Sequence, residues 1–371
     1  MKFKNPIYIT RPIIPNIDLF QEKLKEIWDS KIFSNQGLQH QLLEKELLEI
    51  LKVPYLSLFN NGTIALITAI KSLRLSGDVI TTPFTFAATP HALTWCGIKP
   101  TFCDIDPETF VLDSSKIESL ITPKTTGILA VHVFGIPCNV KQIQEIADFY
   151  GLKVIYDGAH SFQTEIDGKG IGNFGDITMF SFHPTKLFHT SEGGALTYKD
   201  KNFKKRIDLL KNFGIKNEEE VVMTGINGKM NEIQSAIGLV VLLQLEEERK
   251  KRKIILEIYK KYLKEIPGIW FYDFPENIKN SLQYFVIKIN EKMFGRNRNY
   301  VYEKFKEYNV FTRKYFYPLC SDYICYKHLW SAKNLPNANK TVNEVLCLPL
   351  YGDLTEKEVE NICLILKSFK I

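Results

Sequence analysis

Roughly the first 200 residues alternate between short apolar runs and amphipathic stretches, and this alternation restricts the fold. The apolar runs have the length and the β-branched and aromatic content of buried strands. They lie near residues 55–59, 79–82, 102–105, 126–133, 152–157, 177–182 and 193–198. Helical patterns separate the early runs, at 62–75, 86–96, 114–121 and 139–150. This order predicts an α/β fold with a mostly parallel seven-stranded sheet and helices on both faces.

The pattern changes after a long amphipathic stretch from Met230 to about Ile266. Beyond it come a strand-like run, a helix, a second strand-like run and a last helix, at 284–289, 300–308, 311–317 and 356–369. We therefore predict a large domain over 1–246, including the N-terminal segment, and a smaller α+β domain over 247–371. The 371 residues, 45% of them hydrophobic, can bury cores of this size.

Composition favours a cytoplasmic enzyme. The net charge of +6 suits an anionic nucleotide ligand, but it is too diffuse to indicate nucleic-acid binding. The densest basic run, 249–253, follows three glutamates, as on a salt-bridged helix face. Seven cysteines without a CxxC pair predict reduced thiols and no metal site. We expect no signal peptide, because lysines interrupt the N-terminus, and no membrane span, because the apolar run 236–245 is too short.

Lys186 is a candidate catalytic residue because of its position. It ends the segment Ser181-Phe182-His183-Pro184-Thr185-Lys186, just after an apolar strand-like run and before Glu192-Gly193-Gly194. A lysine on a turn beyond a buried strand lies at the rim of an α/β sheet, where a carbonyl cofactor can reach it. Partial desolvation there lowers its pKa, as a Schiff-base lysine requires. For any lysine taken alone, a solvated surface position is the ordinary alternative.

Asp157 is the second candidate. It ends the strand-like run from Leu152, and His160 follows three residues later. A pyridine nitrogen stays protonated only beside an anion, and an aspartate at a strand end can supply that charge. An ordinary turn or helix-cap aspartate is the alternative.

A phosphate site is indicated where the run from Tyr55 to Phe59 breaks at Asn60-Asn61-Gly62-Thr63 and a helical pattern begins. Glycine and threonine at a helix start present free N–H groups and a hydroxyl to an anion, although a plain helix cap has the same residues. Phe86 follows the next strand-like run and could stack on a flat ring, or belong to the core.

The pattern GxGxxG at 170–175 does not indicate a dinucleotide site. It follows the turn Asp167-Gly168 and leads into a strand rather than a helix. We expect tight turns of a hairpin there.

Six segments in this order resemble the signatures of the DegT-type sugar-nucleotide aminotransferases, from about Ser34 to Leu350. They are Asn61-Gly62-Thr63, Pro83-Phe84-Thr85-Phe86, Asp157-Gly158-Ala159-His160, Ser181 to Lys186, Glu192-Gly193-Gly194 and Gly225 to Gln234. Six ordered motifs are far more specific than one. The resemblance implies a dimeric enzyme of the aspartate-aminotransferase fold that uses pyridoxal 5'-phosphate, with pyridoxamine 5'-phosphate as its other form.

The resemblance also implies residue roles. Lys186 is the Schiff-base lysine, and Asp157 is the partner of the pyridine nitrogen. The other implied cofactor contacts are Phe86 on the ring, Gly62, Thr63, Ile64 and Ser181 on the phosphate, His160 near the phenolic oxygen, and Asn227 on the phosphate of the neighbouring subunit. Two positions depart from the family: Gly158 replaces alanine, and Lys229 replaces an arginine, which puts a bidentate contact in doubt.

Within the family, the viosamine branch is most similar, on Tyr8 to Pro12, Leu56 to Phe59 and Lys229 to Glu232. This implies transfer of an amino group from L-glutamate to C4 of a 4-keto-6-deoxyhexose on thymidine diphosphate, for polysaccharides such as O-antigen. His160 agrees, since C3-aminating members carry glutamine there. Arg313 and Lys314 are candidates for holding the diphosphate.

Alternatives remain open at this stage. C3 amination or a uridine carrier is compatible with the same motifs. A dehydratase of this fold carries histidine in place of the lysine, so Lys186 argues against it. A non-catalytic regulator on this scaffold is the alternative from another class, and the intact lysine, aspartate and phosphate turn argue against it.

Overall fold

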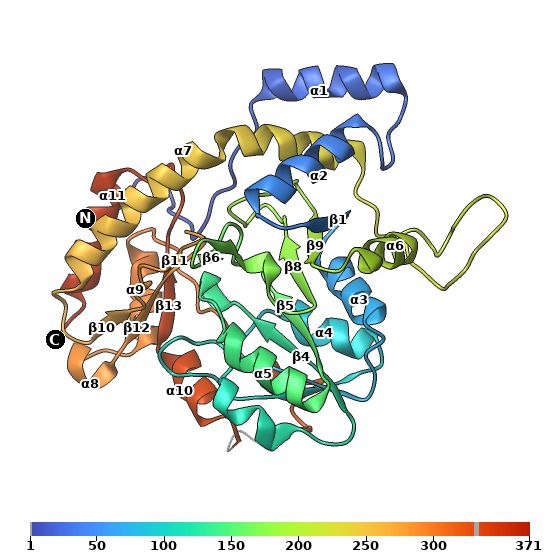
Figure 1. The fold of residues 1–371 in the computed structure, drawn as a ribbon. Helices are drawn as coiled ribbons and strands as arrows, with labels where there is room; N and C mark the ends of the chain where they lie inside the picture. The colour runs from blue at the N-terminus through green and yellow to red at the C-terminus, as the bar shows by residue number, and fades with distance from the viewer. Residues whose placement is uncertain (1, 330–333) are drawn as a thin grey trace.

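The computed structural model describes residues 2–329 and 334–371, and it has a large sheet domain beside a smaller one (Figure 1). The main sheet has seven strands in the order β1-β9-β8-β5-β4-β2-β3. Their bounds are β1 Tyr55–Phe59, β2 Asp78–Thr81, β3 Lys99–Phe102, β4 Thr125–Val131, β5 Lys153–Asp157, β8 Ile177–Ser181 and β9 Gly194–Tyr198. Only β9 runs antiparallel to its neighbours, so the predicted mostly parallel seven-stranded sheet is confirmed.

Helices cover both faces of this sheet, because successive residues of its strands point to opposite sides. In β5, Val154 packs in the core under α5, whereas Ile155 packs in the core under α3 and α4. Leu56 and Leu58 of β1 lie in a third core with α2 and α7. These helices and their neighbours are α1 Ile17–Ser30, α2 Leu38–Ile50, α3 Gly62–Ser72, α4 Ala88–Trp95, α5 Val140–Tyr150, α6 Lys201–Leu210 and α7 Glu232–Leu263.

The expected helix over 114–121 is wrong. The structure has two short 3-10 turns there, Ser114–Lys116 and Glu118–Leu120. Asp113 caps the first turn by accepting from the N–H of Ser115, and Pro123 disfavours helical backbone at Thr122, which limits extension of the second turn.

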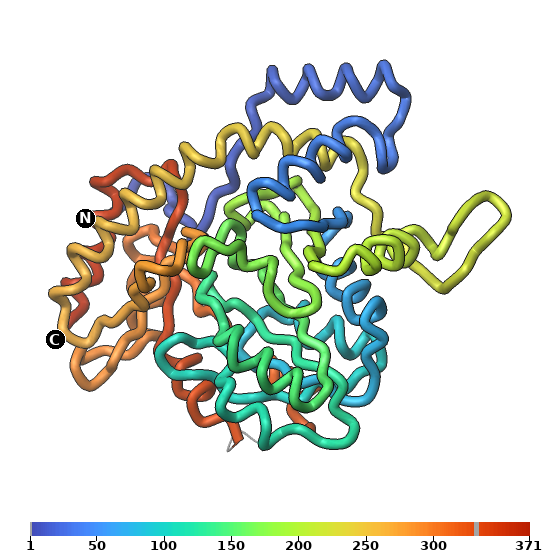
Figure 2. The backbone as a smooth tube through the Cα atoms, viewed as in Figure 1, coloured from blue at the N-terminus to red at the C-terminus, as the bar shows by residue number. Residues whose placement is uncertain are grey.

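The small domain has its own sheet, in the order β10-β12-β13. Its elements are β10 Ile269–Phe271, β12 Phe285–Ile289, α8 Glu291–Phe294, α9 Arg298–Glu307, α10 Pro336–Glu344, β13 Val345–Leu348 and α11 Glu356–Ser368. The N-terminal segment lies against this domain: Ile7 accepts from the N–H of Phe311 and donates to the carbonyl of Asn309. Both termini therefore lie on this side of the molecule (Figure 2).

The expected strand over 311–317 is wrong. Only Arg313 pairs with a strand residue, exchanging two backbone hydrogen bonds with Cys347 of β13. The chain then leaves the sheet, and Tyr315 and Phe316 line a cavity instead.

The expected hairpin is present, but the glycines at 170–175 do not form its turn: Gly170 ends its second strand, and Gly172 lies in a 3-10 turn that follows. The strands of the hairpin are β6 Glu165–Ile166 and β7 Lys169–Gly170, and β11 Ile278–Lys279 pairs with β6. Asp167 and Gly168 both have positive φ, of 50° and 76°, which a tight two-residue hairpin turn requires.

Helix α7 joins the two domains. It begins with a capping box, in which the Asn231 side chain accepts from the N–H of Gln234. It continues without interruption through position 246 to pack against α11. The expected boundary at 246/247 therefore lies inside a helix.

Candidate active site

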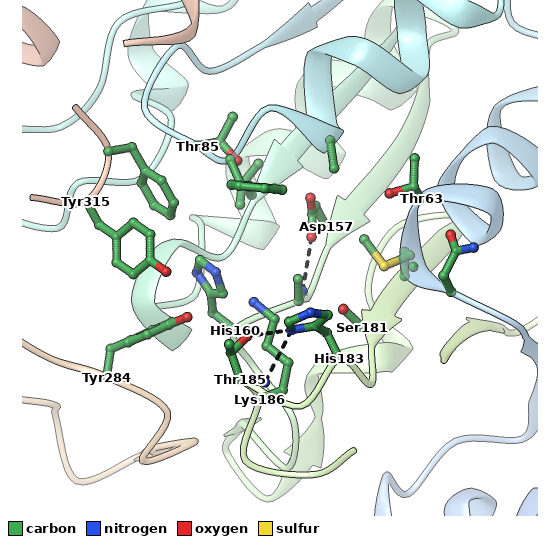
Figure 3. A pocket seen from close by; sticks show the side chains of 18 of the residues that line it. Thr63, Thr85, Asp157, His160, Ser181, His183, Thr185, Lys186, Tyr284 and Tyr315 are labelled. Atoms are coloured by element: carbon green, nitrogen blue, oxygen red, sulfur yellow. Dashed lines mark hydrogen bonds between the residues drawn. The ribbon is translucent and has the colours of Figure 1, made fainter. Parts of the chain in front are cut away.

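A cavity of about 570 Å³ opens beyond the carboxyl ends of the parallel strands, between the two domains (Figure 3). Its walls include the ends of β4, β5 and β8, the start of α3, the loop before α4, and the segment at 313–316. This edge is where ligands bind in open α/β sheets.

Lys186 lies on the turn after β8 and is partly exposed to the cavity. Its backbone N–H donates to the carbonyl of His183 at 2.9 Å, which fixes the turn. Its ammonium makes no hydrogen bond or ion pair within the described residues. Desolvation lowers the pKa of Lys186 from its ordinary value to about 8; Asp157 opposes this shift and Arg313 adds to it. A fraction of the amine is therefore neutral and nucleophilic near neutral pH.

Asp157 ends β5 and lies between Val131 of β4 and Met179 of β8. It is buried, and one carboxylate oxygen accepts from the Thr89 hydroxyl at 2.8 Å, the other from the N–H of Ala159 at 3.0 Å. Burial raises the pKa of Asp157, and the two hydrogen bonds and Lys186 oppose this rise. A cationic N–H placed against such a carboxylate would be strongly stabilised.

The start of α3 forms an anion cradle. The Asn61 side chain accepts from the N–H of Ile64 at 2.8 Å, while the N–H groups of Gly62 and Thr63 have no acceptor among the described residues. A Cβ on Gly62 would lie 3.1 Å from Cβ of Ser181 and 3.3 Å from its hydroxyl, so a side chain there would fill the cradle. The site therefore suits a phosphate held by backbone N–H groups and the Ser181 hydroxyl.

Flat rings line the rest of the cavity. Phe86 is 57% exposed, so its face is free for another ring. His160 is buried, and its Nδ1 accepts from the N–H of Phe134 at 3.2 Å, which places the ring proton on Nε2. Burial, and then Lys186, holds the pKa of His160 well below its ordinary value. Neutral His160 packs edge-on against Tyr284 and stacks on Phe316, at 4.9 and 5.7 Å between ring centroids.

Most of the predicted site residues lie together. Those that line this cavity are Gly62, Thr63, Phe86, Asp157, His160, Ser181, Lys186 and Arg313. Three do not line it. The N–H of Ile64 donates to Asn61, and Lys314 donates to Asn299 at 3.1 Å. Asn227 is exposed in the segment between α6 and α7, where its backbone pairs with Asn212 and its carbonyl accepts from the Asn60 side chain at 3.4 Å.

Sequence reasoning missed several residues at the site. Thr89 holds Asp157, and the small domain contributes Tyr284 and Tyr315, whose rings pack edge-on at 5.5 Å between centroids. The spacing of Thr85 and Thr89, four residues apart at a helix start, was a usable signal, and their hydroxyls lie 2.9 Å apart. The tyrosines have no local pattern that marks them.

Comparisons with known proteins agree with this geometry. Residues 16–367 match the DegT/DnrJ/EryC1/StrS aminotransferase family. The chain belongs to this family. It is 46% identical, over 361 residues and 96% of each chain, to a dTDP-4-amino-4,6-dideoxy-D-glucose transaminase of Escherichia coli. It is 42% identical, over 99% of this chain and the whole of the other, to the transaminase of that name from Shigella dysenteriae.

Solved structures of family members have the same fold. The structure of DesI in the presence of its TDP-sugar product superposes with a TM-score of 0.94 at 32% identity, over 99% of this chain and 93% of the other. Helicobacter pylori PseC superposes with a TM-score of 0.90 at 26% identity, over 99% of each chain. The predicted family, fold and aminotransferase activity are confirmed.

Members of the DegT family depend on pyridoxal phosphate, and so does this enzyme. The cavity fits that cofactor, because it brings together an anion cradle for the phosphate, a buried carboxylate for the ring nitrogen and a desolvated lysine.

Within residues 2–329 and 334–371, none of the helices combines the length and the apolar character that a membrane span requires.

Proposed function

We propose that this aminotransferase moves the amino group of L-glutamate to C4 of a 4-keto-6-deoxyhexose carried on thymidine diphosphate. One observation carries the proposal: along nearly its whole length, the chain is 46% and 42% identical to two dTDP-4-amino-4,6-dideoxy-D-glucose transaminases. The enzyme would act in the cytoplasm.

Lys186 is the proposed catalytic amine. Bound pyridoxal phosphate supplies a reactive carbonyl carbon and a ring that delocalises negative charge. With the cofactor bound, Lys186 would be the residue that holds this carbonyl carbon. The Lys186 amine, once a substrate had replaced it, would carry a proton between the substrate carbon and the cofactor, in one direction for the donor and in the reverse direction for the acceptor sugar. A pKa near 8 suits both roles, since the amine accepts and releases protons close to neutral pH.

Asp157 and His160 are proposed to orient the cofactor. The Asp157 carboxylate keeps the ring nitrogen protonated, and Thr89 and the Ala159 N–H hold that carboxylate in place. His160 presents Nε2–H as a donor, because the bond from the Phe134 N–H fixes the other ring nitrogen as an acceptor. A neutral donor at the phenolic oxygen adds no second cation next to Lys186.

The active site is proposed to be shared in a homodimer. Asn227 does not line its own cavity, and its backbone pairs with that of Asn212, two residues after the end of α6. The segment between α6 and α7 projects from the body (Figure 2). Apolar side chains of this segment are exposed: Phe213, Ile215, Val221 and Val222. An exposed apolar projection needs a partner surface, and a second copy would bring Asn227 to the phosphate cradle of its neighbour.

Arg313 is the proposed contact for the acceptor's diphosphate. It lines the cavity on the small-domain side, and its guanidinium lies 4.5 Å from the ring of Tyr315. Lys314, the adjacent candidate, does not line the cavity and donates to Asn299 instead.

NMR of the product tests the proposal. The holoenzyme, L-glutamate and thymidine-diphosphate-linked 4-keto-6-deoxyglucose should yield a new C–N bond at C4. The 3-keto isomer and the uridine-diphosphate analogue serve as competing substrates. An amine at C3, or turnover only with the uridine analogue, would replace the proposed acceptor while leaving the aminotransferase chemistry in place.

A further inference from the structure

Two cationic side chains of the small domain, Arg298 and Lys314, lie close together, next to the segment 313–316 that forms one cavity wall. Arg298, at the first position of α9, is 1% exposed. Its Nε donates to Oδ1 of Asn299 at 3.1 Å, and its Nη1 donates to the carbonyl of Val345 at 3.0 Å. Its Nη2 is buried and has no acceptor within the described residues. The Nη2 amino group of this buried guanidinium therefore has no acceptor for either of its two N–H donors among the described residues.

Lys314 brings a second positive charge to the same point. Its ammonium donates to the same Oδ1 of Asn299, at 3.1 Å, so two cations share one neutral oxygen. Neither forms an ion pair with a carboxylate in the described part of the chain. Burial lowers the pKa of Arg298 to about 10, and burial together with the Arg298 charge lowers that of Lys314. Buried charges are normally paired, so this arrangement lacks an anion.

The surroundings are aromatic and basic. The ring of Tyr317 lies 5.4 Å from the Arg298 guanidinium and 5.5 Å from the Lys314 ammonium. The ring of Tyr302 has Lys314 at 4.4 Å and Lys306 at 4.2 Å. The carboxylate of Glu303, which acts on Lys314 from this side, is already bonded to Lys306 at 2.8 Å.

We propose that Arg298 and Lys314 form a site for a phosphate-type oxyanion, beside the rings of Tyr302 and Tyr317. The free Nη2–H of Arg298 and the Lys314 ammonium supply charge-assisted donors, which phosphoryl oxygens accept strongly. The anion is either inorganic or the diphosphate of a nucleotide. The site does not depend on the proposed reaction, because the two cations need a counter-ion whichever sugar is aminated. Since Arg313 precedes Lys314, an anion here would be bound by the segment that lines the cofactor cavity.

Calorimetric titration of the cofactor-loaded enzyme with inorganic pyrophosphate at low salt tests the site. Lys314→Gln should weaken binding at least about tenfold, the usual size of one charge-assisted hydrogen bond. Lys304→Gln is the matched control: it removes the same charge from the exposed side of α9, where Lys304 is paired with Glu307 at 2.9 Å. It should change the affinity by less than about twofold. No saturable binding by the wild-type enzyme, or equal losses in both variants, overturns the proposal.

Two further arms locate the anion. Arg313→Gln tests the cavity: if it abolishes pyrophosphate binding while Lys314→Gln does not, the anion binds in the cavity and the proposal is wrong. Competition between thymidine diphosphate and pyrophosphate, with both weakened by Lys314→Gln, supports the site and identifies a nucleotide as its source. Loss of pyrophosphate binding alone supports a site for free anions. Because no acceptor sugar is present, failure of the proposed reaction cannot produce any of these results.

Discussion

Gln283 holds the backbone on both sides of Lys186. Its side-chain oxygen accepts from the N–H of Leu187 at 2.5 Å, and its amide donates to the carbonyl of Thr185 at 2.8 Å. The side chain is buried at 2% exposure and comes from the small domain, just before β12. The position of the proposed catalytic amine is thus set from across the cavity.

Replacement of Gln283 by leucine should therefore lower kcat while the cofactor still binds. Two buried backbone groups would lose their partners, at a cost of roughly 1–3 kcal/mol each in the free energy of unfolding. Gln244→Leu is the control, because Gln244 bridges the Asn16 N–H and the Ile14 carbonyl in the same way, from a half-buried position outside the cavity. Melting curves and single-turnover rates separate the two effects. Equal kcat for the two variants would remove Gln283 from the positioning of Lys186.

Lys186→Ala should abolish turnover and the visible absorption of the bound cofactor, with an unchanged melting profile in the absence of cofactor. Lys186→Arg should fail as well, because a guanidinium stays protonated. Wild-type rates in either variant would show that another amine performs the reaction.

Mixing two inactive proteins should restore activity if the site is shared. A Lys186→Ala subunit paired with an Asn227→Ala subunit has one site that carries neither change. Random pairing then gives about a quarter of the wild-type activity. Sedimentation of a fully active monomer, or no recovery after verified subunit exchange, would contradict the shared site.

Thr89→Val should move the acid limb of the pH profile of kcat upward. The Thr89 hydroxyl lowers the pKa of Asp157, which burial raises. Without that bond the carboxylate protonates at higher pH, and activity falls earlier as the pH decreases. Thr68→Val is the control, since this buried hydroxyl donates only to the Ile64 carbonyl of its own helix. An acid limb identical to that of the wild type would show that Thr89 does not act through Asp157.

The rate at which the cofactor-free enzyme takes up pyridoxal phosphate should rise with pH and level off above about 8, because the neutral amine of Lys186 is the attacking form. Arg313 lowers the pKa of Lys186, so Arg313→Gln should shift this rise to higher pH. Lys314→Gln, which changes the same charge one residue away, should leave it in place. Stopped-flow absorbance measures both, and a downward shift in Arg313→Gln would contradict the assignment.

The large domain and its half of the site could be predicted from sequence because their signals are local. Lys186 and Asp157 each follow an apolar strand, and Gly62 and Thr63 follow a capping asparagine. The small-domain half has no such signal. The segment 311–317 has strand-like composition, but it forms one pair with Cys347 and then turns into the cavity. Gln283 and Tyr284 reach the site through tertiary packing alone, which no periodicity encodes.

The continuous helix α7 also limits where the chain can be cut into two fragments that reassemble. Its 32 residues extend about 48 Å at 1.5 Å per residue, and they form the covalent connection between the two domains. A cut at 246/247 would open the middle of this helix, whereas a break in the segment between α6 and α7 leaves both helices whole. Either cut places Lys186 and Gln283 on different fragments, so we expect two-fragment complementation to be more efficient with the break between α6 and α7.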